Sequence, residues 1–222
     1  MTMGGGMEGP VLVVETSGRC GQIGLARNGV WLEQCQLDGD RRHARDLSSA
    51  IRELLRRHGV EPRAVQGVIV ARGPGSFTGL RVGLATAMTL AYAAGARIVG
   101  IGSFSGLAEQ ANVPEGRVAV VGDALRGCSY HQTFVRSADG WDAETDLVVV
   151  DAVDANGPVL AMTSTWATCP EQASVVQPNL DGLLAQGMRR LKRGEHDAPE
   201  ALEPLYVQPS SAERQWRDLG RF

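Results

Sequence analysis

The sequence predicts an α/β fold built from two similar lobes. Residues 11–15 (VLVVE) form a continuous apolar, β-branched run, which is typical of a buried strand. The later run VAVVGD has the same character, and each run ends in an acid that is followed by a turn and a cysteine. Glu15 and Asp123 are 108 residues apart, as are Cys20 and Cys128, and this offset is close to half of the 222-residue chain. A repeat at such a spacing indicates a duplicated lobe.

Length and composition limit the classes of protein to which the chain can belong. The 222 residues suffice for two lobes of about 100 residues each, and the 43% of hydrophobic residues predicts a globular chain with a substantial core. The formal net charge of −3 gives no overall attraction to nucleic acid. The amino terminus lacks a signal-peptide pattern and no apolar run is long enough to cross a bilayer, so we expect a cytoplasmic protein without membrane contact. The 4 cysteines form no Cys-x-x-Cys pair, which favours buried thiols over a zinc site or a disulfide framework.

The first lobe is expected to open with three antiparallel strands and a helix. Residues 21–27 run back beside the first strand, and the hairpin signal Asn28-Gly29 precedes a third strand over residues 30–37. A helical face with a stop at Gly59 follows, and its apolar positions are Leu47, Ala50, Ile51, Leu54 and Leu55. Residues 41–63 hold seven arginines and three acids. A solvated helix face is the default explanation of this basic excess, and a docking surface for an acidic protein or an RNA is the alternative.

A glycine-rich loop follows the next buried strand, which is predicted over residues 65–71. The loop comprises Gly73, Pro74, Gly75, Ser76, Phe77, Thr78 and Gly79. A Walker A phosphate loop needs a lysine after its second glycine, and this loop has none; in the Rossmann pattern the third glycine would fall at Thr78. The sequence therefore favours a structural turn in which Ser76 or Thr78 caps the next helix. Phosphate binding by the amino terminus of that helix stays an alternative.

An apolar, alanine-rich helix is predicted over about residues 78–94. Small residues lie four apart along one face, at Gly79, Gly83, Ala87 and Ala91. Such a stripe allows another element to approach the helix backbone closely. Packing within the chain and packing against a partner protein are both compatible with it, because the opposite face, with Leu80, Leu84 and Met88, is apolar as well.

The remaining elements are predicted from shorter signals. Strands are expected over residues 97–101, 118–123, 128–135, 147–153 and 158–162, with part of another at 175–176. Helices are expected over residues 103–111 and from Leu180 to a stop at Gly194, and the proline-containing tail over residues 198–222 is expected to be extended. The repeat divides the chain into an N-terminal lobe, residues 10–105, and a second, divergent lobe, residues 106–222.

The ionisable residues give few candidates for chemistry. The 4 histidines contain no His-x-x-x-His pair and no local nucleophile motif is present, so we expect no metal site, no catalytic residue and no cofactor. A Cys/His or Ser/His pair that folding brings together stays open. In a duplicated fold the strand ends at Glu15 and Asp123 would face each other across a cleft. With Thr16 and Ser17 they would form a vestigial nucleotide site, whereas two solvated strand ends are the favoured alternative.

Several segments together resemble one protein family. They are GPGSFTGLRVG at residues 73–83, the opening VLVVETS, His43 with Arg45 and Leu47 at a helix entry, and Pro204-Leu205-Tyr206 near the end. These segments are similar to hallmarks of the TsaB family, also called YeaZ, and the similarity is dense over residues 11–111 and thin afterwards. It implies an actin-like (ASKHA, ribonuclease H-like) α/β fold of two duplicated lobes, in agreement with the repeat. Glu15 stands where the family has an aspartate, and residues 122–126 loosen its Asp-Ala-Arg pattern, so contacts of the second lobe are not carried over.

The resemblance also implies a function. TsaB proteins are noncatalytic partners of the paralogue TsaD, which transfers a threonylcarbamoyl group to the adenosine beside the anticodon of tRNA, and the ATPase TsaE joins them. We therefore expect an accessory subunit that docks a TsaD-like protein, supports recruitment of a TsaE-like ATPase and meets tRNA through the complex. The docking residues expected on the two N-terminal helices are Leu47, Ala50, Ile51, Leu54, Gly79, Arg81, Val82, Gly83, Ala87 and Met88. Formation of a homodimer through the same helices stays open. The rival function is a self-sufficient actin-like ATPase or sugar-kinase-type phosphotransferase that uses Glu15, Asp123 and the glycine-rich loop.

Overall fold

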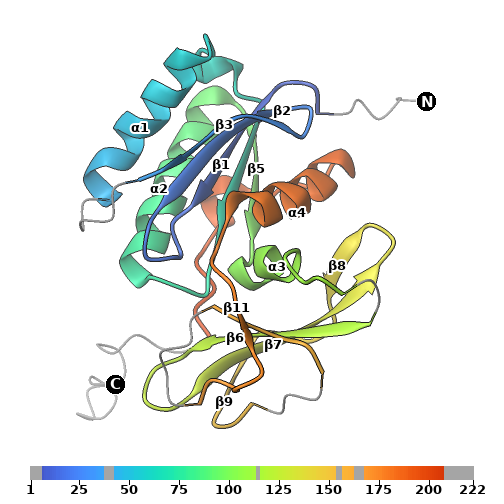
Figure 1. Ribbon diagram of the computed structural model, residues 1–222. Helices are drawn as coiled ribbons and strands as arrows, with labels where there is room; N and C mark the ends of the chain where they lie inside the picture. Colours follow the sequence, from blue (N-terminus) through green and yellow to red (C-terminus); the bar gives the residue numbers. More distant parts are fainter. Residues whose placement is uncertain (1–6, 38–42, 114–115, 154–156, 163–167, 208–222) are drawn as a thin grey trace.

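The computed structural model describes residues 7–37, 43–113, 116–153, 157–162 and 168–207, which form two β-sheets with helices packed around them (Figure 1). Each sheet mixes parallel and antiparallel pairs, which is the α/β architecture predicted from the sequence. Among the described residues, no helix has the length and apolar character needed to span a bilayer.

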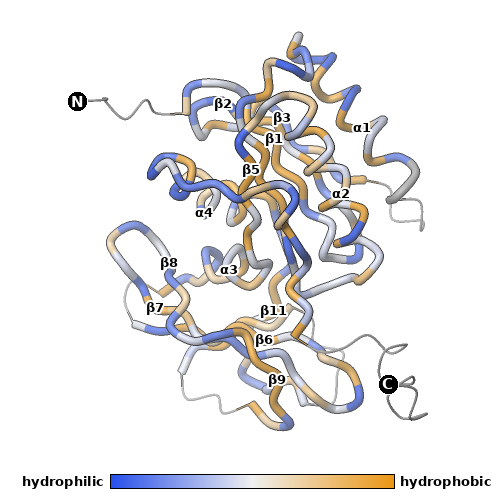
Figure 2. The backbone as a smooth tube through the Cα atoms, turned by 180° about the vertical axis from the view of Figure 1, so that it is seen from behind, coloured by the Kyte–Doolittle hydropathy of each residue, from blue (hydrophilic) through white to orange (hydrophobic). Residues whose placement is uncertain are grey.

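The first sheet has the strand order β3-β2-β1-β4-β5. Its strands are β1 (Pro10–Glu15), β2 (Gln22–Arg27), β3 (Val30–Gln36), β4 (Gly67–Ala71) and β5 (Arg97–Ile101). β1, β4 and β5 run parallel, and β2 and β3 extend the sheet in antiparallel fashion from β1. Every residue of β1 and β4 is buried, because helices cover both faces of these central strands. Hydrophobic residues are accordingly concentrated along β1 and β5 in Figure 2.

Two helices cover one face of the first sheet and a third covers the other (Figure 1). α1 (His43–Arg57) and α2 (Phe77–Ala94) share one core with the sheet, and α4 (Leu180–Lys192) packs on the opposite face. The predicted apolar face of α1 is buried, with Leu47, Ile51 and Leu54 at most 4% exposed. Because burial of one such side chain contributes about 1.5–3 kcal/mol, this face holds α1 on the sheet.

The second sheet repeats the topology of the first. Its strands are β6 (Arg117–Asp123), β7 (Ser129–Ser137), β8 (Gly140–Ala143), β10 (Val159–Ala161) and β11 (Ser174–Val175), with β9 (Val148–Val150) paired to β7 beside this path. β6 pairs with β7 antiparallel and with β10 parallel, just as β1 pairs with β2 and β4. The order β8-β7-β6-β10-β11 therefore matches β3-β2-β1-β4-β5 strand by strand. The duplication predicted from the 108-residue repeat is confirmed.

The last helix of each lobe packs against the sheet of the other lobe. α3 (Ser103–Ala108) follows β5 of the first sheet, yet Phe104 and Leu107 lie in the core of the second sheet. α4 follows β11 of the second sheet, yet Leu183 and Met188 lie in the core beneath the first sheet. The expected division between residues 105 and 106 stays a prediction, and it falls inside α3, one of the two helices that are exchanged between the sheets.

The exchanged helices cross where both have glycine. A Cβ atom on Gly182 of α4 would lie 1.9 Å from the carbonyl oxygen of Gly106 on α3. Contacts of real Cβ atoms with backbone oxygen are much longer, so only glycine permits this approach. The crossing brings the two lobes together at the backbone level.

Some predicted boundaries differ from the observed ones. α3 ends at Ala108 and does not reach residue 111, β9 occupies only part of the predicted strand at 147–153, and β8 was not predicted. The 3₁₀-helices η1 (Pro62–Ala64) and η2 (Pro199–Ala201) begin at prolines, whose fixed φ suits a first helical position. η2 therefore interrupts the tail that was predicted to be extended, and residues 208–222 of that tail lie outside the described residues.

Candidate functional site at the glycine-rich loop and helix α2

The glycine-rich loop is tied to its own chain on two sides. The backbone N–H of Ser76 donates to the carbonyl oxygen of Ser17 (2.8 Å), and the N–H of Ser103 donates to that of Gly73 (2.7 Å). Ser76 also caps α2, because its Oγ accepts from the N–H of Gly79 (3.2 Å). One of the two predicted caps is thus confirmed, and the loop is held between the β1–β2 turn and the start of α3.

Three glycines of the motif pack against one short segment, the β1–β2 turn. A Cβ atom on Gly75 would lie 2.4 Å from the carbonyl oxygen of Ser17, and one on Gly79 would lie 2.1 Å from that of Thr16. On Gly83 it would lie 2.1 Å from Thr16 Oγ1. Gly75 also has φ +157°, a backbone conformation that favours glycine. The glycine spacing of the motif is therefore explained by close packing of α2 on this turn.

The small-residue stripe of α2 faces the interior of the chain. Gly79, Gly83, Ala87 and Ala91 are all buried. Of the two alternatives left open by the sequence, packing within the chain is the one observed, because Thr16 of the β1–β2 turn occupies the space beside Gly79 and Gly83.

Glu15, at the end of β1, is a buried carboxyl group. It is 1% exposed, and burial raises its pKa from 4.5 to about 7, although hydrogen bonds from Ser17 and Gly18 lower it in part. The N–H of Ser17 donates to Glu15 Oε1 at 2.5 Å. The favoured expectation of two solvated strand ends is wrong for Glu15, since β1 is central in the sheet and helices cover its end.

Asp123 occupies the equivalent position in the second lobe but has a different environment. It is partly exposed, and its Oδ1 accepts a hydrogen bond from the N–H of Leu125 (2.7 Å) in the following turn. The structure gathers Glu15, Thr16 and Ser17 at the glycine-rich loop, whereas the observed contact of Asp123 lies within its own turn. A nucleotide site shared by both carboxylates stays a prediction.

The expected docking residues divide by exposure. Leu47, Ile51, Leu54, Gly79, Gly83 and Ala87 are buried in the chain; Ala50, Val82 and Met88 are partly buried; Arg81 is exposed. The buried ones hold α1 and α2 on the first sheet, so they are unavailable to a partner while these helices stay in place. The outer face of α2 instead presents Phe77, Thr78, Arg81, Ala85, Thr89 and Tyr92.

An aromatic–arginine cluster of Phe77, Arg81 and Tyr206 lies on this outer face. The Arg81 guanidinium is 4.1 Å from the centroid of the Phe77 ring, and its Nε–H donates to the Tyr206 hydroxyl (2.8 Å). The two rings are 5.5 Å apart and each is almost half exposed. The family-like Pro-x-Tyr at residues 204–206 was the only sequence signal for Tyr206, and nothing in the sequence placed it on α2.

A groove runs along α2 beside this cluster. Its volume is about 350 Å³, and it is lined by Arg81, Leu84, Ala85, Met88, Leu202, Glu203, Pro204 and Tyr206. The tail is held there because the N–H of Leu205 donates to the carbonyl oxygen of Arg72 (2.8 Å) and Leu202 is buried in the core. Farther along the helix Tyr92 is 85% exposed, which is unusual for so large an aromatic side chain.

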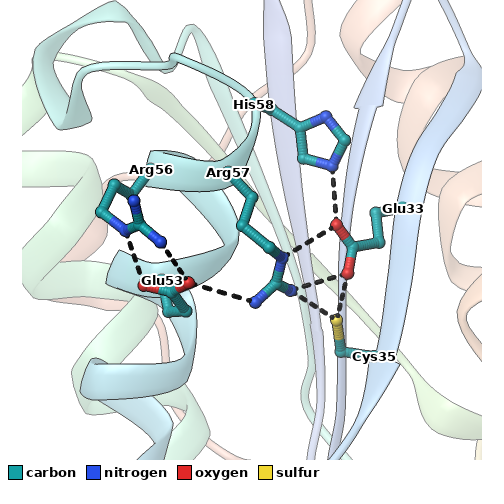
Figure 3. A network of polar contacts seen from close by, with 6 residues as sticks. All are labelled: Glu33, Cys35, Glu53, Arg56, Arg57 and His58. Atoms are coloured by element: carbon teal, nitrogen blue, oxygen red, sulfur yellow. Dashed lines mark hydrogen bonds and ion pairs between the residues drawn. The ribbon is translucent and has the colours of Figure 1, made fainter.

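A polar network fixes the carboxyl end of α1 to the edge strand β3 (Figure 3). Glu33 accepts from Arg57 Nη2 at 2.6 Å and lies 2.7 Å from His58 Nε2, and Arg57 also pairs with Glu53 at 3.6 Å. The Arg57 guanidinium, with smaller contributions from Cys35 and His58, lowers the pKa of Glu33 to about 2. Burial and the Glu33 carboxylate raise the pKa of the Cys35 thiol, so this cysteine is protonated and not a poised nucleophile.

No metal centre is formed within the described part of the chain. Three or more His, Cys, Asp or Glu side chains come together nowhere among these residues in a way that would hold an ion. The contacts described for the glycine-rich loop are packing contacts and hydrogen bonds within the chain.

Comparisons with known proteins agree with this fold and motif. A family model described as TsaD, tRNA N6-adenosine threonylcarbamoyltransferase, matches residues 38–210. The tRNA threonylcarbamoyladenosine biosynthesis protein TsaB of Escherichia coli is 24% identical over 229 residues, covering 94% of this chain and 97% of the relative. The protein of the same name from Bacillus subtilis is 29% identical over 120 residues, covering 54% of this chain and 52% of the relative.

A solved structure extends the match to three dimensions. YeaZ from Pseudomonas aeruginosa superposes with a TM-score of 0.76 and 24% identity, covering 89% of this chain and 99% of that chain. This similarity supports the actin-like, duplicated two-lobe fold expected from the sequence. The chain belongs to the family described as TsaD, tRNA N6-adenosine threonylcarbamoyltransferase, and within it to the TsaB (YeaZ) proteins.

Proposed function

We propose that the chain acts in the biosynthesis of threonylcarbamoyladenosine in tRNA as a noncatalytic scaffold subunit. The names of its relatives support the pathway. The scaffold role is supported by the candidate site, in which the loop and the β1–β2 turn pack against each other and the outer face of α2 carries contact-forming side chains. In this role the chain binds a TsaD-like catalytic subunit and supports recruitment of a TsaE-like ATPase in the cytoplasm. Its association with tRNA is through the complex.

The observation that carries the proposal is the exposed outer face of α2. Arg81 is the single charged residue of this 18-residue helix, and the remaining exposed side chains are aromatic, small or hydroxyl-bearing. A face with exposed aromatics and one arginine has the composition of protein–protein interface centres. The docking residues are therefore revised to Phe77, Arg81, Ala85, Met88 and Tyr92, and the partly buried Val82 of α2 and Ala50 of α1 are kept as marginal members.

Co-elution with a TsaD-like protein tests the docking face. Arg81→Glu and Tyr92→Asp change exposed side chains, so we expect both variants to fold while the affinity for the partner falls at least about tenfold. Arg126→Glu, an equal change of charge at an exposed position in the second lobe, is the matched control and should bind normally. Unchanged co-elution of both α2 variants, with wild-type melting temperatures, would refute docking through this face.

A reconstituted modification assay tests the role. Modification of tRNA by TsaD-like and TsaE-like proteins with activated substrate should depend on this chain, and the isolated chain should neither bind ATP with magnesium tightly nor turn it over. Tight binding with turnover would instead establish the rival function, an actin-like ATPase or a sugar-kinase-type phosphotransferase.

A further inference from the structure

A second groove lies on the opposite face of the first sheet from α1 and α2. It is formed by the β2–β3 turn and α4, and its volume is about 360 Å³. Its lining residues are Asn28, Gly29, Trp31, Asp181, Leu184, Ala185, Met188, Arg189 and Lys192. The groove is remote from the proposed docking face, so its occupant is independent of the proposed function.

Trp31 gives this groove a fixed aromatic surface. The indole ring lies against Gly24 of β2, where a Cβ atom would be 2.5 Å from Trp31 Cζ3. Its Nε1–H donates to Asp181 Oδ1 at 2.7 Å, and Gln34 Nε2 donates to the same oxygen at 3.2 Å. A β-bulge near residue 32 turns both Trp31 and Gln34 toward α4. The ring is thus oriented before any ligand arrives, which lowers the entropic cost of stacking on it.

Lys192 supplies the positive charge of the groove. It is the single lysine of the chain, it is exposed, and it takes part in no ion pair among the described residues. Arg189 is occupied, because its Nη2 donates to Glu109 Oε1 and to the carbonyl oxygen of Trp141, both at 3.0 Å. Asp181 and Lys192 are eleven residues apart on α4, which corresponds to about 16 Å along the helix axis.

The groove therefore has three different parts in a row. Trp31 and the carboxylate of Asp181 lie toward one end, the apolar side chains of Leu184 and Met188 lie between, and the ammonium of Lys192 lies at the other end. An apolar lipid chain would leave both charges unpaired, and a bare anion would not use the ring. Because side chains on a helix lean toward its amino terminus, the Lys192 ammonium can reach back along the groove and shorten the span of about 16 Å. A ligand with a planar ring, hydrogen-bond donors beside it and an anionic group farther along the groove uses all three parts.

We propose that this groove binds a nucleotide. The base stacks on Trp31, Asp181 accepts a hydrogen bond from an amino or ribose hydroxyl group, and Lys192 pairs with the phosphate. The nucleotide is either a free mononucleotide or one unit of a single RNA strand, because both present the same ring and phosphate.

Calorimetric titration with AMP, adenosine and inorganic phosphate tests the site. We expect saturable binding of AMP at millimolar concentrations or below, weaker binding of adenosine and no measurable binding of phosphate alone. Lys192→Gln should weaken AMP binding about tenfold and leave adenosine unchanged, since it removes one charge-assisted contact. Arg193→Gln is the matched control, because Arg193 is adjacent, pairs with Asp139 at 2.8 Å and does not line the groove.

The role of the ring is tested separately. Trp31→Leu should weaken AMP and adenosine together, whereas Trp31→Phe keeps a stacking surface and should retain most of the affinity. If Trp31→Leu fails to fold, as judged by its melting curve, the AMP and adenosine affinities of wild type, Trp31→Phe and Lys192→Gln still test the proposed site. A short single-stranded RNA then distinguishes the sources: affinity that exceeds that of AMP and depends on Trp31 and Lys192 assigns RNA, and equal affinity assigns the free nucleotide.

Three results would overturn the proposal. They are absence of saturable binding by both AMP and the RNA, equal weakening by Lys192→Gln and Arg193→Gln, and binding of phosphate as tight as that of AMP. The second would mean general charge attraction, and the third an anion site without recognition of a ring.

Discussion

Glu15 is an acid in a place where its ionised form is disfavoured. Its side chain is buried, and its pKa of about 7 lies well above the 4.5 of an exposed glutamate. The folded protein therefore holds this proton more tightly than the unfolded chain does. By linkage, the contribution of Glu15 to the free energy of unfolding is highest below pH 4.5 and decreases as the pH rises toward 7, by about 3 kcal/mol in all.

Replacement of Glu15 by Gln tests this linkage. Gln stays neutral at every pH and its Oε1 can still accept from the N–H of Ser17, so the variant should lose the decrease in stability between pH 4.5 and 7 and exceed wild type at pH 8. Urea unfolding across this range is the measurement. Glu8→Gln, at an exposed position, should keep the wild-type profile. Parallel profiles for wild type and Glu15→Gln would mean that Glu15 is not strongly perturbed.

At the scale of single elements, the glycines of α2 allow the helix to pack directly on the β1–β2 turn, because a side chain at these positions would not fit. Gly79 and Gly83 both face Thr16, but the atom that a Cβ would meet differs. At Gly83 it is the side-chain Oγ1 of Thr16, and at Gly79 it is the backbone carbonyl oxygen. Substitution of Thr16 can remove its side-chain Oγ1, but no substitution removes its backbone carbonyl oxygen.

This difference gives a compensation experiment on α2. Gly83→Ala should lower the free energy of unfolding by about 1–3 kcal/mol through overpacking. Adding Thr16→Ala should restore part of the loss, because the clashing Oγ1 is removed and the remaining Cβ of Thr16 lies 3.2 Å from the new methyl group. Gly79→Ala should lose stability as well, and Thr16→Ala should not rescue it. Equal rescue at both positions in chemical denaturation would contradict the packing described for this turn.

Local patterns were sufficient to predict several elements. The apolar run of β1, the hairpin signal at Asn28-Gly29 and the helical face around Leu54 each depend on neighbours in sequence, and all three are confirmed. The side of α2 that faces the core could not be predicted, because both sides are apolar. The contact of Tyr206 with Arg81 joins residues 125 positions apart, so no local pattern encodes it. The burial of Glu15 likewise depends on helices distant in sequence.

At the scale of the whole molecule, the exchange of α3 and α4 couples the two lobes. Polar contacts reinforce the glycine crossing, since Arg189 and Gln186 of α4 both donate to Glu109, which follows α3, and to the carbonyl oxygen of Trp141 in β8. Glu109 and Arg189 are each about 15% exposed, so loss of one partner would leave a largely buried charge. The lobes are therefore expected to unfold as one unit.

Gly182→Ala tests this coupling. Its methyl group would collide with the backbone of Gly106, so we expect a loss of about 1–3 kcal/mol and reduced protection of amides in both sheets, measured by hydrogen exchange. Ala185→Ser, at an exposed position on the same helix, should leave protection unchanged. Loss of protection confined to the second sheet would show that the lobes are energetically independent.

The exchange of helices also has a consequence for synthesis on the ribosome. The strands of the first sheet are complete once residue 101 has been translated, but the helix that covers one of its faces ends at residue 192. At about 5–20 residues per second, translation of the intervening segment takes on the order of ten seconds. During that interval the nascent chain exposes the apolar sheet face that α4 later covers. Early release, or truncation before α4, therefore leaves an aggregation-prone fragment with an exposed apolar face. Chaperone binding during translation should be strongest for chains of this intermediate length.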